Sequence, residues 1–391
     1  MAAKTKKIKD LKAGFSKKKS KLGINIWRFF FNAQNSVSGA EQMFFIEFEI
    51  LNPSIAQSEA VLSFKPKVKI SADDLQYALA GTQSAASIET EEKNLPTYCT
   101  VRCGMLGIVP KQICLYYPVK EVKFNSRPFE IIVGKNFFSE TNLNGFLALS
   151  KEEISKHPEY LCDSGKVSWE ITYSTTTEVC SGENSKLFRW FPSGLQTSFS
   201  GKITFDGDEY IVLPNKCFGY SERYFGKSLV EPWFHISCNN LTSVISGKTL
   251  FNSAFSIQGI FDGRVAFLGK FEDNRIEFPT ELSKRQYSCF WDCVQMPENE
   301  EPDENLLHWT VSLNSKNWVI DVDIYCRIKE VFNRRLELPD ASRHVMNMLQ
   351  GATGTGEIKL YKKNGSVLEQ LEHANLTKVV CEFGHCEQSE F

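Results

Sequence analysis

Short β-prone runs separated by turn residues make up most of this chain, and this pattern constrains its fold more than any other feature. Phe44–Ile50 alternates apolar and acidic residues at its end, and Val167–Tyr173 is a second run of this kind. In the segment 203–212, Asp206 and Gly207 separate two apolar runs, which is the signature of a tight hairpin. The sequence therefore predicts an antiparallel all-β protein.

Helical patterns are scarce in the sequence. Lys151–His157 has the acidic residues and the length of one short helix that ends before Pro158, and Arg343–Gln350 is a second candidate. No stretch approaches the roughly 18 consecutive apolar residues of a membrane-spanning helix. A chain of 391 residues with many hairpins and few helices favours barrels or sandwiches.

Two segments about half the chain apart resemble each other. Residues 27–35 and 233–240 both begin with Trp, continue as a hydrophobic strand and end in Asn-rich turn material. This repeat indicates two structurally similar halves. We therefore expect three parts, which are a basic disordered arm (1–22), an N-terminal barrel (23–190) and a C-terminal barrel (191–391).

Charge is unevenly distributed along the chain. The formal net charge is only −2, which argues against a nucleic-acid partner. The first 21 residues, however, carry nine lysines against one acid, Asp10. Such an arm is typical of a solvated tail, and the alternative is contact with an anionic membrane surface. Because the arm lacks an uninterrupted apolar core, no secretory signal is recognised. We expect a cytoplasmic protein, with peripheral membrane contact as the alternative.

Several chemistries are excluded by their missing motifs. The 12 cysteines are scattered, so reduced thiols are expected, and the single Cys/His cluster at 381–386 lacks the paired spacing of a zinc site. The glycine-rich run Gly351–Gly356 lacks the Lys-Ser/Thr ending of a phosphate loop and precedes a strand. No Gly-x-Ser-x-Gly elbow is present. We therefore expect neither a metal nor a cofactor.

One segment resembles a known family. Phe218–Gly226, followed by Pro232-Trp233, is similar to the Tyr-x-Asp/Glu-Lys-Asn-Trp-Gly and Pro-Trp pattern of tocopherol cyclase-like proteins. The hairpin Gly201–Tyr210 resembles that family's Gly-x-Ile/Val-x-x-Asp-Gly-x-x-Tyr, and the carotenoid hydratase family is similar in outline. The resemblance implies two tandem antiparallel lipocalin-like (calycin-like) β-barrels with few short helices and a cavity for a prenylated or polyene lipid. The family's Asn-Trp is Tyr224-Phe225 here, which keeps an aromatic residue and loses the amide.

The resemblance also implies a site. Ring closure on a prenylated quinol needs an acid held neutral by burial, a role for which Glu222 is the candidate. Aromatic faces would stabilise the resulting cation. The expected catalytic residues are Glu222, Tyr224 and His235, and the expected ligand-binding residues are Tyr220, Arg223, Phe225, Trp233 and Trp27. Each also has a structural interpretation: Glu222 and Arg223 can form an ion pair, and His235 can be a core residue on the same strand face as Trp233.

Three hypotheses about function follow from the sequence. The first is a cofactor-independent, acid-catalysed cyclase or hydratase that acts on a prenyl lipid. The second is a non-catalytic, lipocalin-like carrier of a hydrophobic ligand, and the third is a scaffold whose barrels are filled with side chains. An aromatic-lined cavity with an inward-pointing acid would favour the enzyme, and a cavity without ionisable groups would favour the carrier.

Overall fold

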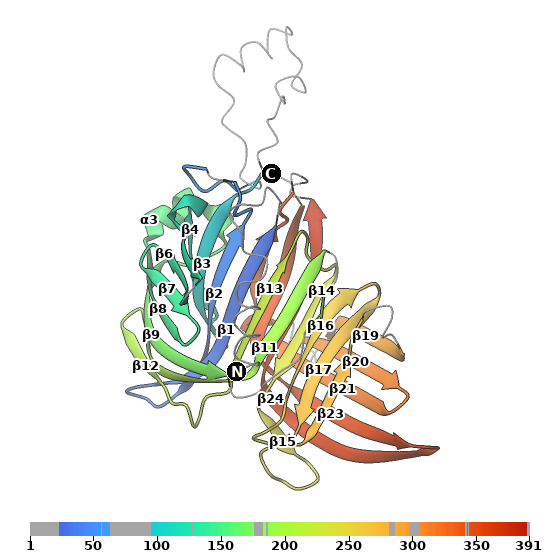
Figure 1. Cartoon of the computed structure of the whole chain (residues 1–391). Helices are drawn as coiled ribbons and strands as arrows, with labels where there is room; N and C mark the ends of the chain where they lie inside the picture. The colour runs from blue at the N-terminus through green and yellow to red at the C-terminus, as the bar shows by residue number, and fades with distance from the viewer. Residues whose placement is uncertain are drawn as a thin grey trace.

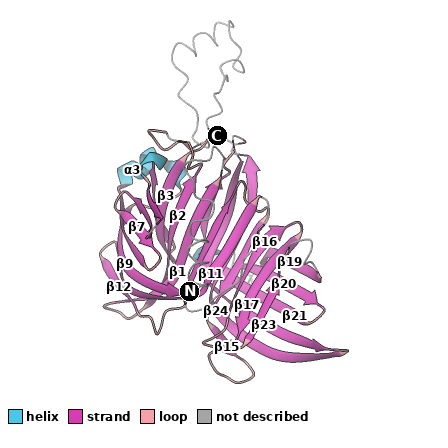
Figure 2. Ribbon diagram, viewed as in Figure 1, coloured by secondary structure: helices cyan, strands magenta, loops and turns pink. Residues whose placement is uncertain are grey.

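The structure is a computed structural model that describes residues 23–388 apart from 56, 63–94, 127, 176–182, 185–186, 281–285, 297–304, 341 and 343. The expected basic arm, 1–22, lies outside the described residues. Two curled antiparallel sheets stand side by side (Figure 1), and strands make up most of the described chain (Figure 2). The predicted all-β fold is confirmed.

The first sheet holds 13 strands that lie between Ile24 and Gly226. They are β1 (Ile24–Asn35), β2 (Glu41–Leu51), β3 (Tyr98–Leu106), β4 (Lys111–Tyr117), β5 (Lys123–Ser126), β6 (Phe129–Val133), β7 (Asn136–Ser139), β8 (Asn142–Leu149), β9 (Gly165–Thr175), β10 (Glu183–Asn184), β11 (Phe188–Phe205), β12 (Asp208–Val212) and β13 (Gly219–Gly226).

The second sheet holds 11 strands and begins at Trp233. They are β14 (Trp233–Cys238), β15 (Leu241–Ser243), β16 (Ala254–Phe261), β17 (Arg264–Phe271), β18 (Asn274–Phe278), β19 (Tyr287–Met296), β20 (Leu306–Ser315), β21 (Trp318–Arg327), β22 (Phe332–Glu337), β23 (His344–Asn364) and β24 (Val367–Gln388).

Both sheets follow the same route. Each is an up-and-down meander in which the first strand pairs with the last: β1 pairs with β12 and β13, and β14 and β15 pair with β24. In each sheet, the two strands at the ends of the hydrogen-bonded order follow each other in the chain. They are β4 and β5 in the first sheet and β18 and β19 in the second. This circular order is that of up-and-down, lipocalin-like barrels, so the predicted tandem barrels are confirmed. The two Trp-led segments form the corresponding first strands, β1 and β14.

Large side chains fill both barrels. Along β1, Trp27, Phe29 and Phe31 point into the first barrel, where they pack with Phe48 and Phe138. The second barrel has its own apolar core, in which Phe234, Ile257, Trp309 and Val322 are among the buried residues. Burial of this much apolar surface is the main stabilising contribution to each barrel.

The described structure corrects one element and moves one boundary. Arg343–Gln350 was expected as a helix. Instead, His344–Gln350 is the first part of β23, which pairs with β22 on one side and with β24 on the other. The change of sheet falls between Gly226 and Trp233, later than the expected boundary at 190/191, because β11 to β13 close the first barrel. That the two barrels fold as separate domains stays a prediction.

The short helix after β8 is as expected. It is α3 (Lys151–Lys156), with a capping box between Ser150 and Glu153, and it is the one α-helix of the described chain. Three 3₁₀ turns accompany it, at Val119–Glu121, Pro158–Tyr160 and Ile328–Glu330. No helix among the described residues has the length and apolarity needed to cross a bilayer.

Candidate functional site: a buried polar junction between the barrels

The two barrels meet along a side-chain layer that we call the junction. It is formed by the outward faces of β1, β2, β3, β11 and β13 from the first sheet and of β14, β16, β17, β22, β23 and β24 from the second. Its two apolar ends each mix residues of both sheets: Ile26 packs in one cluster with Leu336, and Phe30 packs in another with Val380. Between these ends the junction is polar, although both of its walls are buried.

A row of alternating charges crosses the first wall of the junction. Arg102, Glu47, Arg28 and Glu222 are successive cross-strand neighbours on β3, β2, β1 and β13. All four are buried, none more than 3% exposed. Opposite charges on adjacent strands attract, and in a dry layer this attraction is needed to offset the loss of hydration.

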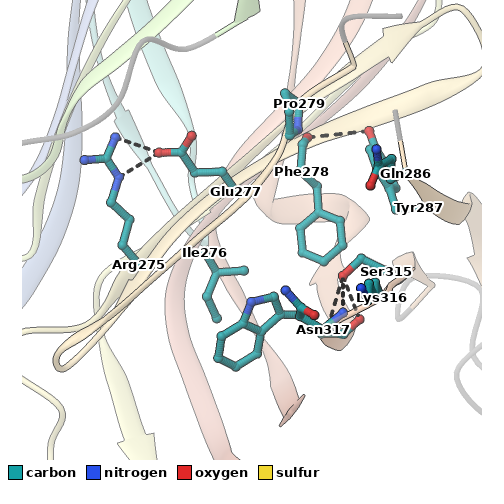
Figure 3. Close-up of a pocket in the computed structure, with 11 residues that line it drawn as sticks. Arg275, Ile276, Glu277, Phe278, Pro279, Gln286, Tyr287, Ser315, Lys316 and Asn317 are labelled. Atoms are coloured by element: carbon teal, nitrogen blue, oxygen red, sulfur yellow. Dashed lines mark hydrogen bonds and ion pairs between the residues drawn. The ribbon is translucent and has the colours of Figure 1, made fainter. Parts of the chain in front are cut away.

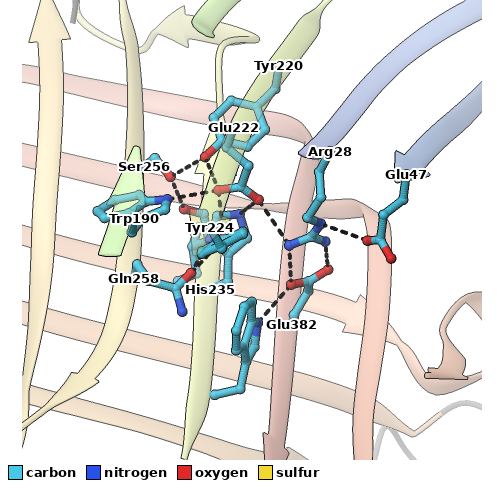
Figure 4. Close-up of polar contacts among 12 residues, drawn as sticks. Arg28, Glu47, Trp190, Tyr220, Glu222, Tyr224, His235, Ser256, Gln258 and Glu382 are labelled. Atoms are coloured by element: carbon cyan, nitrogen blue, oxygen red, sulfur yellow. Dashed lines mark hydrogen bonds and ion pairs between the residues drawn. The ribbon is translucent and has the colours of Figure 1, made fainter. Parts of the chain in front are cut away.

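Glu222 lies at the centre of this network (Figure 4). Its two oxygens accept hydrogen bonds from Arg28 Nη1 at 3.0 Å and from Trp190 Nε1 at 2.9 Å. The hydroxyls of Tyr220 and Tyr224 each lie 2.6 Å from the same carboxyl group. Arg28 and Trp190 can only donate, so Glu222 accepts a hydrogen bond at each of its two oxygens.

The second wall carries a matching pair, His235 and Gln258. His235 Nδ1 lies 3.0 Å from Gln258 Oε1, so Nδ1 is the nitrogen that donates. Gln258 Oε1 also lies 2.8 Å from the Tyr224 hydroxyl, which ties the two walls together. His235 Nε2 faces Glu222 Oε1 at 3.8 Å and has no hydrogen-bond partner among the described residues. Of the two ring nitrogens, Nε2 is therefore the one left without a hydrogen bond within the described chain.

Glu382 on β24 is the second carboxylate of the network. Arg28 binds both of its oxygens, one of them at 2.9 Å, and Trp233 Nε1 donates to it at 2.9 Å. Burial opposes ionisation of Glu382, but the charge of the Arg28 guanidinium outweighs burial and holds the pKa of Glu382 below the usual value. Burial raises the pKa of Tyr224, and the neighbouring Glu222 charge raises it further, so this hydroxyl keeps its proton.

The pKa of Glu49 shifts in the opposite direction to that of Glu382. Glu49 lies two residues after Glu47 on the same face of β2 and is 1% exposed. Burial, reinforced by the Glu47 charge, raises its pKa to about 8, although Arg334 and Arg102 act against this rise. Its Oε1 atom has no hydrogen-bond partner among the described residues. At neutral pH, Glu49 is therefore a protonated carboxylic acid inside the junction.

Glu47 links the arginine beside Glu49, Arg334, to the arginine that binds Glu222, Arg28. It pairs with Arg334 of β22 on one side and lies 3.5 Å from Arg28 Nε on the other. The junction thus holds a neutral carboxyl group, Glu49, and an ionised one, Glu382, within the same buried layer. Within the described chain, no three His, Cys, Asp or Glu side chains are arranged to hold a metal ion.

The structure divides the expected site residues into two groups. Glu222, Tyr224, Tyr220, His235 and Trp233 all lie in the junction, with Trp233 and His235 on one face as expected. This face points to the other barrel rather than into its own.

The remaining three expected residues lie on the opposite face, inside the first barrel. There the Arg223 guanidinium lies 4.8 Å from the Trp27 ring and 4.8 Å from the Phe225 ring, and it donates to Asn25 Oδ1 at 3.1 Å. Arg223 therefore has aromatic partners and does not pair with Glu222, which Arg28 holds instead.

Several members of the junction were not anticipated from the sequence. The signal for them is a charged residue with apolar neighbours on both sides inside a predicted strand, as for Arg28 between Trp27 and Phe29 and for Glu382 between Cys381 and Phe383. The unanticipated members are Arg28, Glu47, Glu49, Arg102, Trp190, Ser256, Gln258, Arg334 and Glu382.

A separate hollow of about 460 Å³ opens at the seam of the second barrel, where β18 and β19 do not pair (Figure 3). Phe278, Tyr287 and Trp318 line its apolar side, and an ion pair between Arg275 and Glu277 lies at its polar side. The Tyr287 hydroxyl crosses the seam to donate to Val265 O at 2.9 Å. Its volume suits a small organic ligand.

Comparison with known proteins gives remote likenesses. No family model matches the sequence, and no curated protein matches it. The crystal structure of a protein assigned as AttH from Nitrosomonas europaea is 8% identical over 91% of this chain and 92% of that chain, with a TM-score of 0.43. Kievitone hydratase from Nectria haematococca is 11% identical over 92% of this chain and 88% of that chain, with a TM-score of 0.45. Neither likeness adds to what the strand order shows, and the tocopherol cyclase-like assignment stays a prediction.

Proposed function

We propose that the protein catalyses an acid–base addition to a carbon–carbon double bond, of the hydratase or cyclase type, in the junction between its barrels. One observation carries this proposal. Within a single buried layer, the pKa of Glu49 is raised to about 8 while that of Glu382 is lowered. Neighbouring groups whose environments separate their pKa values in this way are suited to act as acid and base.

Glu49 replaces Glu222 as the proton donor in this proposal. An acid for alkene protonation must be neutral before it reacts, and both oxygens of Glu222 already accept hydrogen bonds, one from Arg28 and one from Trp190. The negative charges of Glu222 and Glu382, together with the Tyr224 ring, would stabilise a carbocation. His235 Nε2 would accept the proton released when a water or phenol oxygen adds to that cation.

The proposed substrate class is a prenylated phenol or quinol, or a polyene. The apolar clusters at both ends of the junction, around Ile26 and around Phe30, suit the hydrocarbon part of such a molecule. The addition needs no redox partner. The alkene carbon gains the Glu49 proton, His235 takes the proton of the added hydroxyl group, and return of that proton to Glu49 restores both groups.

The test is deuterium transfer to carbon. The protein is incubated in heavy water with a prenylated hydroquinone, and the product is analysed by mass spectrometry for one carbon-bound deuterium. Glu49→Gln should lower the rate by about 10²–10⁴-fold, the usual contribution of a general acid. Glu277→Gln, at the seam of the second barrel, is the matched control and should leave the rate unchanged.

Two outcomes would contradict the proposal. The first is a wild-type protein that leaves the probe unlabelled, and the second is a Glu49→Gln variant that labels it at the wild-type rate. Binding of the unlabelled probe, lost in Trp318→Ala, would favour the second candidate, a non-catalytic carrier. The observation that favours the carrier is the aromatic-walled hollow at the β18–β19 seam.

A further inference from the structure

The second barrel has a seam where no hydrogen-bonded ladder closes it. Among the described strands, β18 pairs with β17 alone and β19 pairs with β20 alone. The hollow of about 460 Å³ lies at this seam, beside the turn between β20 and β21 (Figure 3). Its volume falls within the roughly 300–1,000 Å³ that small-molecule sites occupy. The seam therefore leaves room for a ligand at the margin of the barrel core.

The inner side of the hollow is apolar and buried. Ile276, Phe278 and Tyr287 line it, and they are 1%, 2% and 8% exposed. All three belong to the apolar core of the second barrel. A flat ring placed against them would bury one of its faces on this core, and such burial is the main source of affinity in small-molecule sites.

The protein itself holds these aromatic walls in place. The Phe278 and Tyr287 rings meet edge to face, with centroids 5.1 Å apart and planes at 85°. The Tyr287 hydroxyl donates to Val265 O at 2.9 Å, and the Arg264 guanidinium donates to the Tyr287 carbonyl oxygen. Because the walls are already ordered, a rigid ring that enters the hollow loses little conformational entropy.

Trp318 adds a third aromatic wall from the β20–β21 turn. It is half-buried, and Ser315 Oγ accepts a hydrogen bond from its backbone N–H at 3.1 Å. Lys316 lies two residues earlier in the same turn, is exposed, and also lines the hollow. One short turn therefore presents an aromatic ring and a cation to the same space.

The polar side of the hollow has one more positive charge than negative. Arg275 and Glu277 neutralise each other, with Arg275 Nη2 2.6 Å from Glu277 Oε1. Lys316 forms no ion pair with the described residues. The remaining charge is therefore that of Lys316, which attracts an anionic group to this side.

We propose that the seam binds a flat aromatic molecule with an anionic substituent, such as an aromatic carboxylate. Its ring contacts Trp318 and the buried wall around Phe278, and its anionic group lies toward Lys316. This ligand differs from the uncharged prenyl lipid of the carrier hypothesis. The inference stands on the geometry of the seam and holds whether or not the junction is catalytic.

The experiment is equilibrium dialysis of the full chain with 2-naphthoate and with 2-naphthamide, which has the same ring system and shape but no charge. An exposed ion pair contributes little, so we expect naphthoate to bind about two- to fivefold more tightly than naphthamide at low salt. This preference should disappear at about 1 M salt, where charges are screened within about 3 Å.

Three variants test where the probes bind. Trp318→Ala should weaken the binding of both probes by about tenfold, because one aromatic wall is lost. Lys316→Met should remove the preference for naphthoate and leave the binding of naphthamide unchanged. Lys329→Met is the matched control, an exposed lysine of the same barrel that does not line the hollow, and it should bind both probes as the wild type does.

Three results would overturn the proposal. The first is a wild-type protein that binds neither probe. The second is equal affinity for naphthoate and naphthamide at low salt, which would refute the anionic class of ligand. The third is wild-type binding of both probes by Lys316→Met and Trp318→Ala, which would place the probes outside the seam.

Discussion

Replacing Glu49 with glutamine should make the protein more stable at neutral and alkaline pH. In the folded protein, burial raises the pKa of Glu49 to about 8 from an ordinary value of 4.5. Between these two values the folded chain binds a proton that the unfolded chain has released. Unfolding is therefore favoured as the pH rises, and the stability lost is about 1.4 kcal/mol per pH unit.

The size of this loss of stability follows from the same two pKa values of Glu49. Below about pH 4.5 the carboxyl group is protonated in both states and contributes nothing to the pH dependence. Above about pH 8 it is ionised in both states, and the accumulated cost is about 5 kcal/mol. The charges that face Glu49 are those of Glu47 on its own strand, Arg102 on β3, and Arg334 and Glu337 on β22. Glutamine keeps the shape of the neutral acid and removes the ionisation.

Urea unfolding of wild type and Glu49→Gln, measured from pH 5 to pH 9, checks this prediction. The difference in unfolding free energy should grow with pH in favour of the variant and level off above about pH 8. Glu209→Gln, an exposed acid on β12, is the control and should follow the wild type. Parallel curves for wild type and Glu49→Gln would refute the reasoning, because they would show that Glu49 is ionised in the folded protein.

Three further substitutions test the packing of the same structure by urea unfolding. Arg28→Met should cost about 3–5 kcal/mol because it leaves Glu222 and Glu382 buried without their cation, and a loss below about 1 kcal/mol would contradict this. Trp27→Ala should cost about 3–5 kcal/mol by emptying the space beside Phe138, and an unchanged midpoint would argue against a filled barrel. Gly356→Ala should destabilise by more than about 2 kcal/mol because its Cβ would lie 1.9 Å from a backbone oxygen of β21, and wild-type stability would place that strand further away.

The barrels could be predicted because strand alternation is a local signal. Val167–Tyr173 alternates inward and outward residues, and the structure buries Val167, Trp169, Ile171 and Tyr173 in the first barrel. The hairpin at Asp206-Gly207 is equally local, since left-handed backbone at these two residues closes the turn. The strand at His344–Gln350 was mistaken for a helix because one of its two partners, β24, pairs with it through residues at the far end of the chain, where His344 meets Gln388.

The junction could be predicted only in part, because a sequence does not show what covers a strand's outer face. The acids of Phe44–Ile50 fit a strand with one solvated face, and the second barrel buries that face instead. Glu222 and its two tyrosines were found through the family resemblance. Glu49 was missed, since its neutrality depends on burial and on the charge of Glu47 rather than on a motif.

Infrared difference spectroscopy tests most directly whether one buried layer holds a neutral and an ionised carboxyl group. Spectra of wild type minus Glu49→Gln and of wild type minus Glu382→Gln are recorded at pH 7. The account predicts that the first difference contains the C=O band of a protonated carboxyl group and that the second contains a carboxylate band. Carboxylate bands in both differences would contradict it.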